Sequence, residues 1–185
     1  PDGMRKNEAF PEPIITPSTK AAQGEHDESV APSELYKRGA VEPGLYKELA
    51  RISMRLYERG VARAADHGMI FVDTKYEFGI SNGKIMLMDE VNTPDSSRYW
   101  MKDDYEARFE KGEEPRKLDK EYVRTWLSEK GFTGKGKPPK LTDDLRVEAS
   151  ARYMEVVEKF TGEPMQLDVG PVDKSIYSIL NPFAF

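Results

Sequence analysis

Apolar residues recur at helical spacing over a long segment in the first half of the chain. Between residues 43 and 67 they lie three or four positions apart, and they are Leu45, Leu49, Ile52 and Leu56. This spacing places apolar side chains on one face of a helix, and Gly68 is a natural C-terminal stop. The pattern therefore predicts a helix over residues 43–67.

Further helices are predicted from the same periodicity and from capping residues. Thr142 can cap a helix that Gly162 stops. Its inward positions are Leu145, Ala149, Tyr153, Val156, Val157 and Phe160. The other helical segments expected are 119–131, with Asp119 as its cap, 33–38 and 105–109.

A two-residue alternation separates the long helical segments. The apolar run at residues 69–72 leads into Asp73-Thr74-Lys75-Tyr76-Glu77-Phe78-Gly79. Successive side chains of a strand point to opposite faces, so alternate residues share a face. One face would carry Asp73, Lys75 and Glu77, and the other Tyr76, Phe78 and Ile80. The apolar set can anchor a core while the charged set lines a site.

The turn at residues 81–83 (Ser-Asn-Gly) decides which charged residues meet across the predicted hairpin. A two-residue Asn-Gly loop would set Tyr76 opposite Asp89, leaving Glu77 and Asp89 on different faces. A three-residue loop would instead set Lys75 opposite Asp89. Opposed residues share a face, so Lys75, Glu77 and Asp89 would then converge. For an ionic site, we expect the three-residue loop.

These elements predict an α+β fold in which helices pack on a small antiparallel sheet. Three parts are expected: an extended segment at residues 1–32, an α+β domain at 33–160 and a tail at 161–185. The apolar residues of the tail predict that it docks on the fold or on a neighbouring subunit. They are Ile176, Tyr177, Ile179, Leu180, Phe183 and Phe185.

Composition narrows the class of protein. The 185 residues are 38% hydrophobic and carry a net charge of −5, which argues against a general nucleic-acid binder. No apolar run approaches the roughly 20 residues that a membrane span needs. The absence of cysteine excludes disulfides and thiolate metal sites and fits a reducing compartment. We therefore expect a cytoplasmic protein that binds neither nucleic acid nor membrane.

Glu77 and Asp89 are the candidate metal ligands. Carboxylate oxygens suit Mg²⁺, which commonly takes one or two of them together with nucleotide phosphates. The alternative is a cross-strand charge cluster satisfied by Lys75 and Lys84. Spacing alone leaves these two interpretations equally open.

Arg98 follows the turn-like run at residues 95–97 and is the candidate anion-binding residue. A guanidinium group matches the geometry of a phosphate. The alternative is a structural ion pair between Arg98 and Asp95.

Several stretches resemble one enzyme family. Residues 71–79 (FVDTKYEFG), 89–90 (DE) and 93–100 (TPDSSRYW) are similar to the signature of phosphoribosylaminoimidazole-succinocarboxamide synthase, the SAICAR synthetase family of purine biosynthesis. Residues 13–20 (PIITPSTK) and 24–28 (GEHDE) also resemble that family. The similarity extends from the first residues to about residue 160.

The resemblance implies an ATP-dependent carbon–nitrogen ligase with an ATP-grasp-like fold. Its substrates would be carboxyaminoimidazole ribonucleotide, L-aspartate and ATP, with Mg²⁺ as the metal. It assigns catalysis to Lys75 and Glu77, metal binding to Glu77 and Asp89, and ATP binding to these three residues together. The residues implied in substrate binding are Arg98, Ser97, Asp27, His26, Ser18 and Lys20, with the 5′-phosphate of the ribonucleotide on Arg98.

The resemblance also implies a missing part. Family members begin with an N-terminal nucleotide-binding region that has no counterpart here. The chain is therefore expected to be the C-terminal part of a longer polypeptide, inactive alone, with that region as its partner and with a possible oligomer. Two alternatives are a kinase-like phosphotransferase and a non-catalytic homologue that serves as an interaction module.

Overall fold

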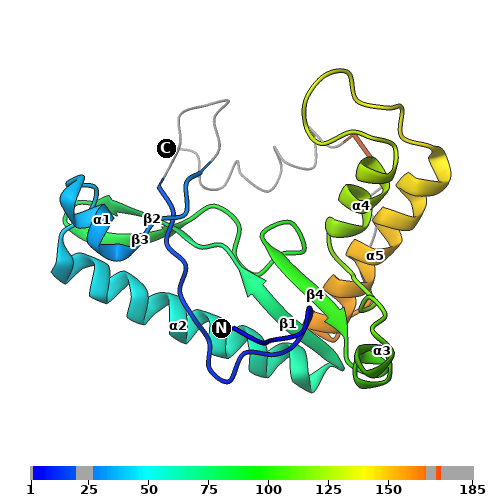
Figure 1. Cartoon of the computed structure of the whole chain (residues 1–185), viewed down its shortest axis with the longest axis horizontal. Helices are drawn as coiled ribbons and strands as arrows, with labels where there is room; N and C mark the ends of the chain where they lie inside the picture. The colour runs from blue at the N-terminus through cyan, green and yellow to red at the C-terminus, as the bar shows by residue number, and fades with distance from the viewer. Residues whose placement is uncertain (1, 20–26, 166–169, 172–185) are drawn as a thin grey trace.

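The computed structural model describes residues 2–19, 27–165 and 170–171, and Figure 1 shows the arrangement of their helices and strands. In chain order these are α1 (Pro32–Lys37), α2 (Pro43–Asp66), β1 (Met69–Thr74), β2 (Glu77–Ser81), β3 (Lys84–Met88), β4 (Ser97–Met101), α3 (Tyr105–Lys111), α4 (Glu121–Glu129) and α5 (Asp143–Thr161). The strands form two small antiparallel sheets, and helix α2 packs on the β1–β4 sheet, so the predicted α+β class is confirmed.

Helix α2 is the longest element and extends from the β2–β3 hairpin to the β1–β4 sheet (Figure 1). It ends at Asp66, with Gly68 in the left-handed conformation at φ +72°. This confirms the predicted helix to within one residue. Gly60 and Ala64 are buried on the side that faces β1.

The core lies between α2, the β1–β4 sheet and α5. Its buried residues are Ala64, Met69, Phe71, Tyr99, Met101, Leu118 and Val156, with Tyr57 and Phe160 packed against them. The Phe71 ring lies 5.4 Å from that of Tyr57 and 5.1 Å from that of Tyr99, between ring centroids. Because β1 and β4 pair antiparallel with Phe71 opposite Tyr99, the aromatic contacts and the strand ladder reinforce each other.

The predicted continuous strand through residues 73–79 is wrong. The chain leaves the β1–β4 sheet after Thr74 and enters a separate sheet at Glu77, with residues 75 and 76 between them. Asp73 and Glu77 therefore belong to different sheets. A register shift between Phe71 and Asp73 brings Asp73 opposite Arg98.

The predicted three-residue turn is also wrong. Ser81 pairs with Lys84 and Glu77 with Met88, so the loop is the two residues Asn82 and Gly83. Their φ values are +50° and +72°, as in a type I′ turn, whose twist matches that of the flanking strands. The intrinsic preference of Asn-Gly outweighs the convergence of charges that we expected.

Helix α5 begins where Thr142 predicted, whereas the N-cap of α4 is Lys120, one residue after the predicted cap Asp119, and it forms no side-chain capping hydrogen bond. The Thr142 hydroxyl accepts the Leu145 N–H at 3.2 Å, and α5 ends at Gly162 with φ +80°. The predicted tail docking falls almost wholly on residues outside the described part of the chain, and the three-part division remains a prediction. Among the helices described here, none combines the length and the apolar character required to cross a bilayer.

Replacing Gly60 tests how closely α2 approaches its neighbours. A Cβ at this position would lie 2.8 Å from Phe71 Cε1 and 3.1 Å from Asn92 Nδ2. We expect Gly60→Ala to lower the free energy of unfolding by about 1–3 kcal/mol, as overpacking does, measured by urea denaturation. Gly44→Ala is the control, since nothing lies within 4 Å of its Cβ. Equal stability of the two variants would contradict this close packing.

Candidate functional site

A charged cleft of about 420 Å³ lies beside the β1–β4 sheet, the loop at residues 89–96 and the start of α4. It is lined by Asp73, Lys75, Asp89, Glu90, Asp95, Ser96, Ser97, Arg98, Lys120, Glu121 and Arg124. Nine of these eleven side chains are ionisable. A cleft lined by charged residues of both signs and by two serines suits a polar, highly charged ligand better than an apolar one.

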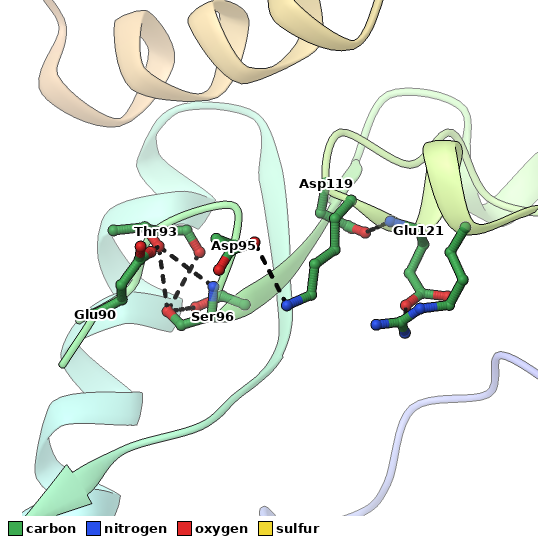
Figure 2. A network of polar contacts seen from close by, with 9 residues as sticks. Glu90, Thr93, Asp95, Ser96, Asp119 and Glu121 are labelled. Atoms are coloured by element: carbon green, nitrogen blue, oxygen red, sulfur yellow. Dashed lines mark hydrogen bonds and ion pairs between the residues drawn. The ribbon is translucent and has the colours of Figure 1, made fainter. Parts of the chain in front are cut away.

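The loop at residues 89–96 is held by its own side chains (Figure 2). The Thr93 hydroxyl contacts the Glu90 carboxylate and accepts the Ser96 N–H at 3.3 Å. The Thr93 carbonyl accepts the Ser97 N–H at 2.9 Å. These bonds close the loop into a tight turn immediately before β4.

Arg98 forms a two-point ion pair with Asp73. Arg98 Nε donates to Asp73 Oδ1 at 2.8 Å, and Nη2 contacts Oδ2. This hydrogen bond raises the pKa of Arg98. The expected alternative pairing with Asp95 is wrong, because the strand register places Asp73 opposite Arg98. Asp95 instead lies 3.5 Å from the ammonium of Lys120.

Lys75 occupies the connection between the two sheets and contacts two carboxylates. Its ammonium lies 2.6 Å from Glu77 Oε1 and 3.6 Å from Asp27 Oδ2. The hydrogen bond to Glu77 raises the pKa of Lys75, so this side chain is cationic at neutral pH. The structure thus brings together three residues that the sequence analysis had placed in the site.

Glu77 and Asp89 are not brought together by the strand ladder. Glu77 pairs with Met88, and Asp89 follows the strand in a left-handed conformation at φ +62°. Asp89 lines the cleft whereas Glu77 does not. Among the residues that the structure describes, no three His, Cys, Asp or Glu side chains are grouped closely enough to hold a metal ion. A magnesium site at Glu77 and Asp89 remains a prediction.

The other predicted substrate-binding residues have different surroundings. Ser97 is buried, and its hydroxyl donates to Thr74 Oγ1 at 2.9 Å. Ser18 forms an isolated bridge with Ser29. His26 and Lys20 lie outside the described residues.

Lys120, Glu121 and Arg124 line the cleft from the start of α4, and the sequence analysis missed them. The signal for them in the sequence is Asp119, which predicts a helix start at this point of the chain. Its carboxylate is buried and accepts two backbone N–H groups, from Tyr99 at 3.0 Å and from Glu121 at 2.8 Å. It therefore ties β4 to α4 and fixes the first turn of α4 at the cleft (Figure 2).

Comparison with known proteins identifies the family. Residues 1–140 match the family model described as SAICAR synthetase. The chain belongs to the SAICAR synthetase family. It is 53% identical over 165 residues to phosphoribosylaminoimidazole-succinocarboxamide synthase of Bacteroides thetaiotaomicron, and 50% identical to that of Bacteroides fragilis. Each match covers 88% of this chain and 52% of the relative.

Solved structures of SAICAR synthetases share the fold. The SAICAR synthase of Saccharomyces cerevisiae in complex with SAICAR matches with a TM-score of 0.72 at 35% identity, over 90% of this chain and 52% of that one. A type-2 SAICAR synthetase in complex with ADP matches with a TM-score of 0.64 at 26% identity, over 89% and 57% of the two chains. The chain thus spans about half the length of the SAICAR synthetases that it matches.

Asp119→Asn tests the junction between β4 and α4. The amide can accept only one of the two N–H groups and turns its own NH₂ toward the other. We expect a loss of about 1–3 kcal/mol in the free energy of unfolding at pH 7, the cost of an unsatisfied buried group. Chemical denaturation measures it. Asp66→Asn, at the exposed end of α2, is the control and should change stability by less than about 0.5 kcal/mol.

The difference in stability between the wild type and Asp119→Asn should depend on pH, and the pKa of Asp119 predicts the direction of the change. Burial raises the pKa of Asp119 above its ordinary value of 3.8, so the folded state binds this proton more tightly than the unfolded state does. The contribution to stability is complete below the unfolded pKa and is lost as the pH rises through the folded pKa. The stability of the wild type relative to Asp119→Asn should increase as the pH falls through this window. A constant difference would contradict the raised pKa.

Proposed function

We propose that this protein acts in the SAICAR synthetase reaction, the ATP-dependent joining of L-aspartate to carboxyaminoimidazole ribonucleotide. The products would be SAICAR, ADP and phosphate. The observation that carries the proposal is the charged cleft, because eight of its eleven lining residues come from the stretches at residues 71–79, 89–90 and 93–100 that resemble the family signature. The family match over residues 1–140 and the related structures with SAICAR and with ADP support it.

The reaction requires activation because a carboxylate is a poor electrophile. In the first step the substrate carboxylate oxygen forms a bond to the terminal phosphorus of ATP, and ADP leaves. In the second step the aspartate amine attacks the carbonyl carbon of this acyl phosphate. The new C–N bond forms as the C–O bond to phosphate breaks, and the amine loses a proton.

Lys75 is suited to the charge that accumulates in both steps. Negative charge develops on the phosphoryl group in transfer and on the carbonyl oxygen under attack, and a fixed cation stabilises it. Its ammonium is held at 2.6 Å from Glu77, so it is oriented before substrate binds. Glu77 thereby fixes the position of the Lys75 ammonium and, by raising its pKa, keeps it protonated.

Arg98 is suited to the ribonucleotide phosphate. Its guanidinium already engages a carboxylate at two points, the geometry with which it would hold a phosphate. It is half exposed, so a phosphate can approach it from the cleft. Lys120 and Arg124 add two further cations to the same cleft.

Of the two candidate magnesium ligands, Asp89 lines the cleft and Glu77 does not. Two carboxylates, Glu77 and Asp89, together with the phosphates of a nucleotide, are a usual set of ligands for this ion. When bound, Mg²⁺ would neutralise charge on the phosphates.

The chain spans about half the length of its relatives, so we assign the rest of the nucleotide pocket to an N-terminal region outside this chain. We propose that the reaction takes place in the cytoplasm.

The ligase is favoured over the two alternatives. The SAICAR synthetases of Bacteroides match 88% of this chain, and the charged stretches of the signature form one cleft. An interaction module does not require four cations and five carboxylates in a cleft. A phosphotransferase would form a phosphorylated product without consuming aspartate.

Lys75→Met tests the catalytic role in the full-length natural protein. We expect kcat for aspartate-dependent SAICAR formation to fall about 10²–10³-fold, the usual effect of removing one electrostatic contact to the transition state. Lys84→Met, at an exposed lysine on β3, is the control and should leave kcat unchanged. A wild-type protein that hydrolyses or transfers phosphate without aspartate would overturn the ligase assignment.

Arg98→Lys tests phosphate binding. A single ammonium group cannot reproduce the two parallel hydrogen bonds of a guanidinium. We expect KM for the ribonucleotide to rise about tenfold or more, as for a loss of about 1.4 kcal/mol in binding, while KM for aspartate changes little. Steady-state kinetics with each substrate varied in turn separates the two. A rise confined to the KM for aspartate would assign Arg98 to the amino acid instead.

A further inference from the structure

Asn92 lies at the centre of the loop that carries four lining residues of the cleft, yet it does not line the cleft itself. The four are Asp89, Glu90, Asp95 and Ser96. Its backbone is left-handed, at φ +58°, a conformation that asparagine tolerates better than most residues. Its interactions point away from the cleft, toward the core.

Two tyrosine hydroxyls donate to Asn92. The Tyr76 hydroxyl donates to Asn92 Oδ1 at 2.7 Å, and the Tyr99 hydroxyl donates to the Asn92 carbonyl at 2.5 Å. Tyr99 is fully buried in the core. Burial raises the pKa of Tyr76 to about 12, so its hydroxyl remains a donor throughout the working range of pH.

The side chain of Asn92 lies against helix α2 at Gly60. Asn92 Nδ2 lies 3.1 Å from where a Cβ would stand on Gly60, so the absence of a side chain at Gly60 makes room for it.

A backbone hydrogen bond is a second link between the loop and the connection that follows β1. The Lys75 N–H donates to the Ser96 carbonyl at 3.1 Å. The loop is thus attached to the same short segment at two points.

Tyr76 lies between Lys75 and Glu77 in the chain, so the hydrogen bond from Tyr76 to Asn92 joins the two halves of the cleft. On one side is Lys75, held by Glu77 from outside the cleft lining, and on the other is the loop at residues 89–96. We propose that Tyr76 and Asn92 form a clasp of positioning residues, which sets the loop carboxylates relative to Lys75 for the reaction. This inference rests on the proposed function for its consequence in catalysis, but the clasp itself can be tested without it.

The test compares conservative variants of the full-length natural protein. Tyr76→Phe removes only the hydroxyl, and Asn92→Gly removes the acceptor while keeping the left-handed backbone accessible. Asn92→Asp keeps an acceptor oxygen for Tyr76. Tyr57→Phe is the matched control, because its hydroxyl donates to the Phe71 and Val72 carbonyls at 3.3 and 3.1 Å and does not contact the loop.

Three readouts separate positioning from a general loss of stability. We expect Tyr76→Phe and Asn92→Gly each to lower kcat/KM and the affinity for SAICAR, measured by calorimetry, about 5–10-fold, in line with one hydrogen bond. Hydrogen exchange of residues 89–96 should become faster in both. The double variant should be no worse than either single one. Asn92→Asp should show only a small part of the loss that Asn92→Gly shows. Tyr57→Phe should lower thermal stability without changing kcat/KM, the affinity for SAICAR or the hydrogen exchange of the loop.

The outcomes distinguish the clasp from the proposed function. A wild type that neither forms nor binds SAICAR would overturn the proposed function. The clasp would then still be tested by whether residues 89–96 exchange faster in Tyr76→Phe and Asn92→Gly than in the wild type. An active wild type in which Tyr76→Phe behaves as Tyr57→Phe does, in kinetics and in loop exchange, would overturn the clasp. Additive losses in the double variant would also overturn it, because they would mean that the two residues act separately.

Discussion

The pairing of β1 with β4 on helix α2 is the constraint on which the rest of the structure depends. Phe71 and Tyr99 are opposed in this ladder, and their rings pack at a tilt in the core between α2 and α5. Asp73 lies two residues further along β1, and Arg98 lies one residue before Tyr99 in β4, so the buried pair leads directly to two residues that line the cleft. The geometry of the site is therefore inherited from core packing, which tolerates little displacement.

Charge balance within the cleft is the second constraint. Each of its four cations has a carboxylate partner: Lys75 has Glu77, Arg98 has Asp73, Lys120 has Asp95 and Arg124 has Glu121. Such pairs orient the cations at little net electrostatic cost, and exposed pairs are individually weak. An anionic ligand can replace a carboxylate partner without moving the cation far. Binding would then be a partner exchange, sensitive to ionic strength.

Local signals in the sequence predicted most of the fold and part of the site. The cap at Thr142 and the stop at Gly68 depend on neighbouring residues only, and the structure confirms them. Asp119 lies one residue before the N-cap of α4, although its carboxylate accepts the Glu121 N–H. The predicted three-residue turn at residues 81–83 is wrong because the local preference of Asn82-Gly83 for a two-residue turn is stronger than any attraction among the charged residues of the hairpin. The contribution of α4 was missed for another reason, since Asp119 joins it to β4 through tertiary contacts that no spacing reveals.

The interruption after Thr74 determines where Lys75 lies. A single continuous strand would have kept Asp73 and Glu77 in one sheet, with the lysine as one member of a row. Instead the chain passes from one sheet to the other at residues 75 and 76, so Lys75 stands where both sheets and the loop at residues 89–96 meet. A ligand that contacts Lys75 and Arg98 together would bridge two sheets that share no strand, and the free energy of that bridge would depend on how firmly the loop is fixed between them.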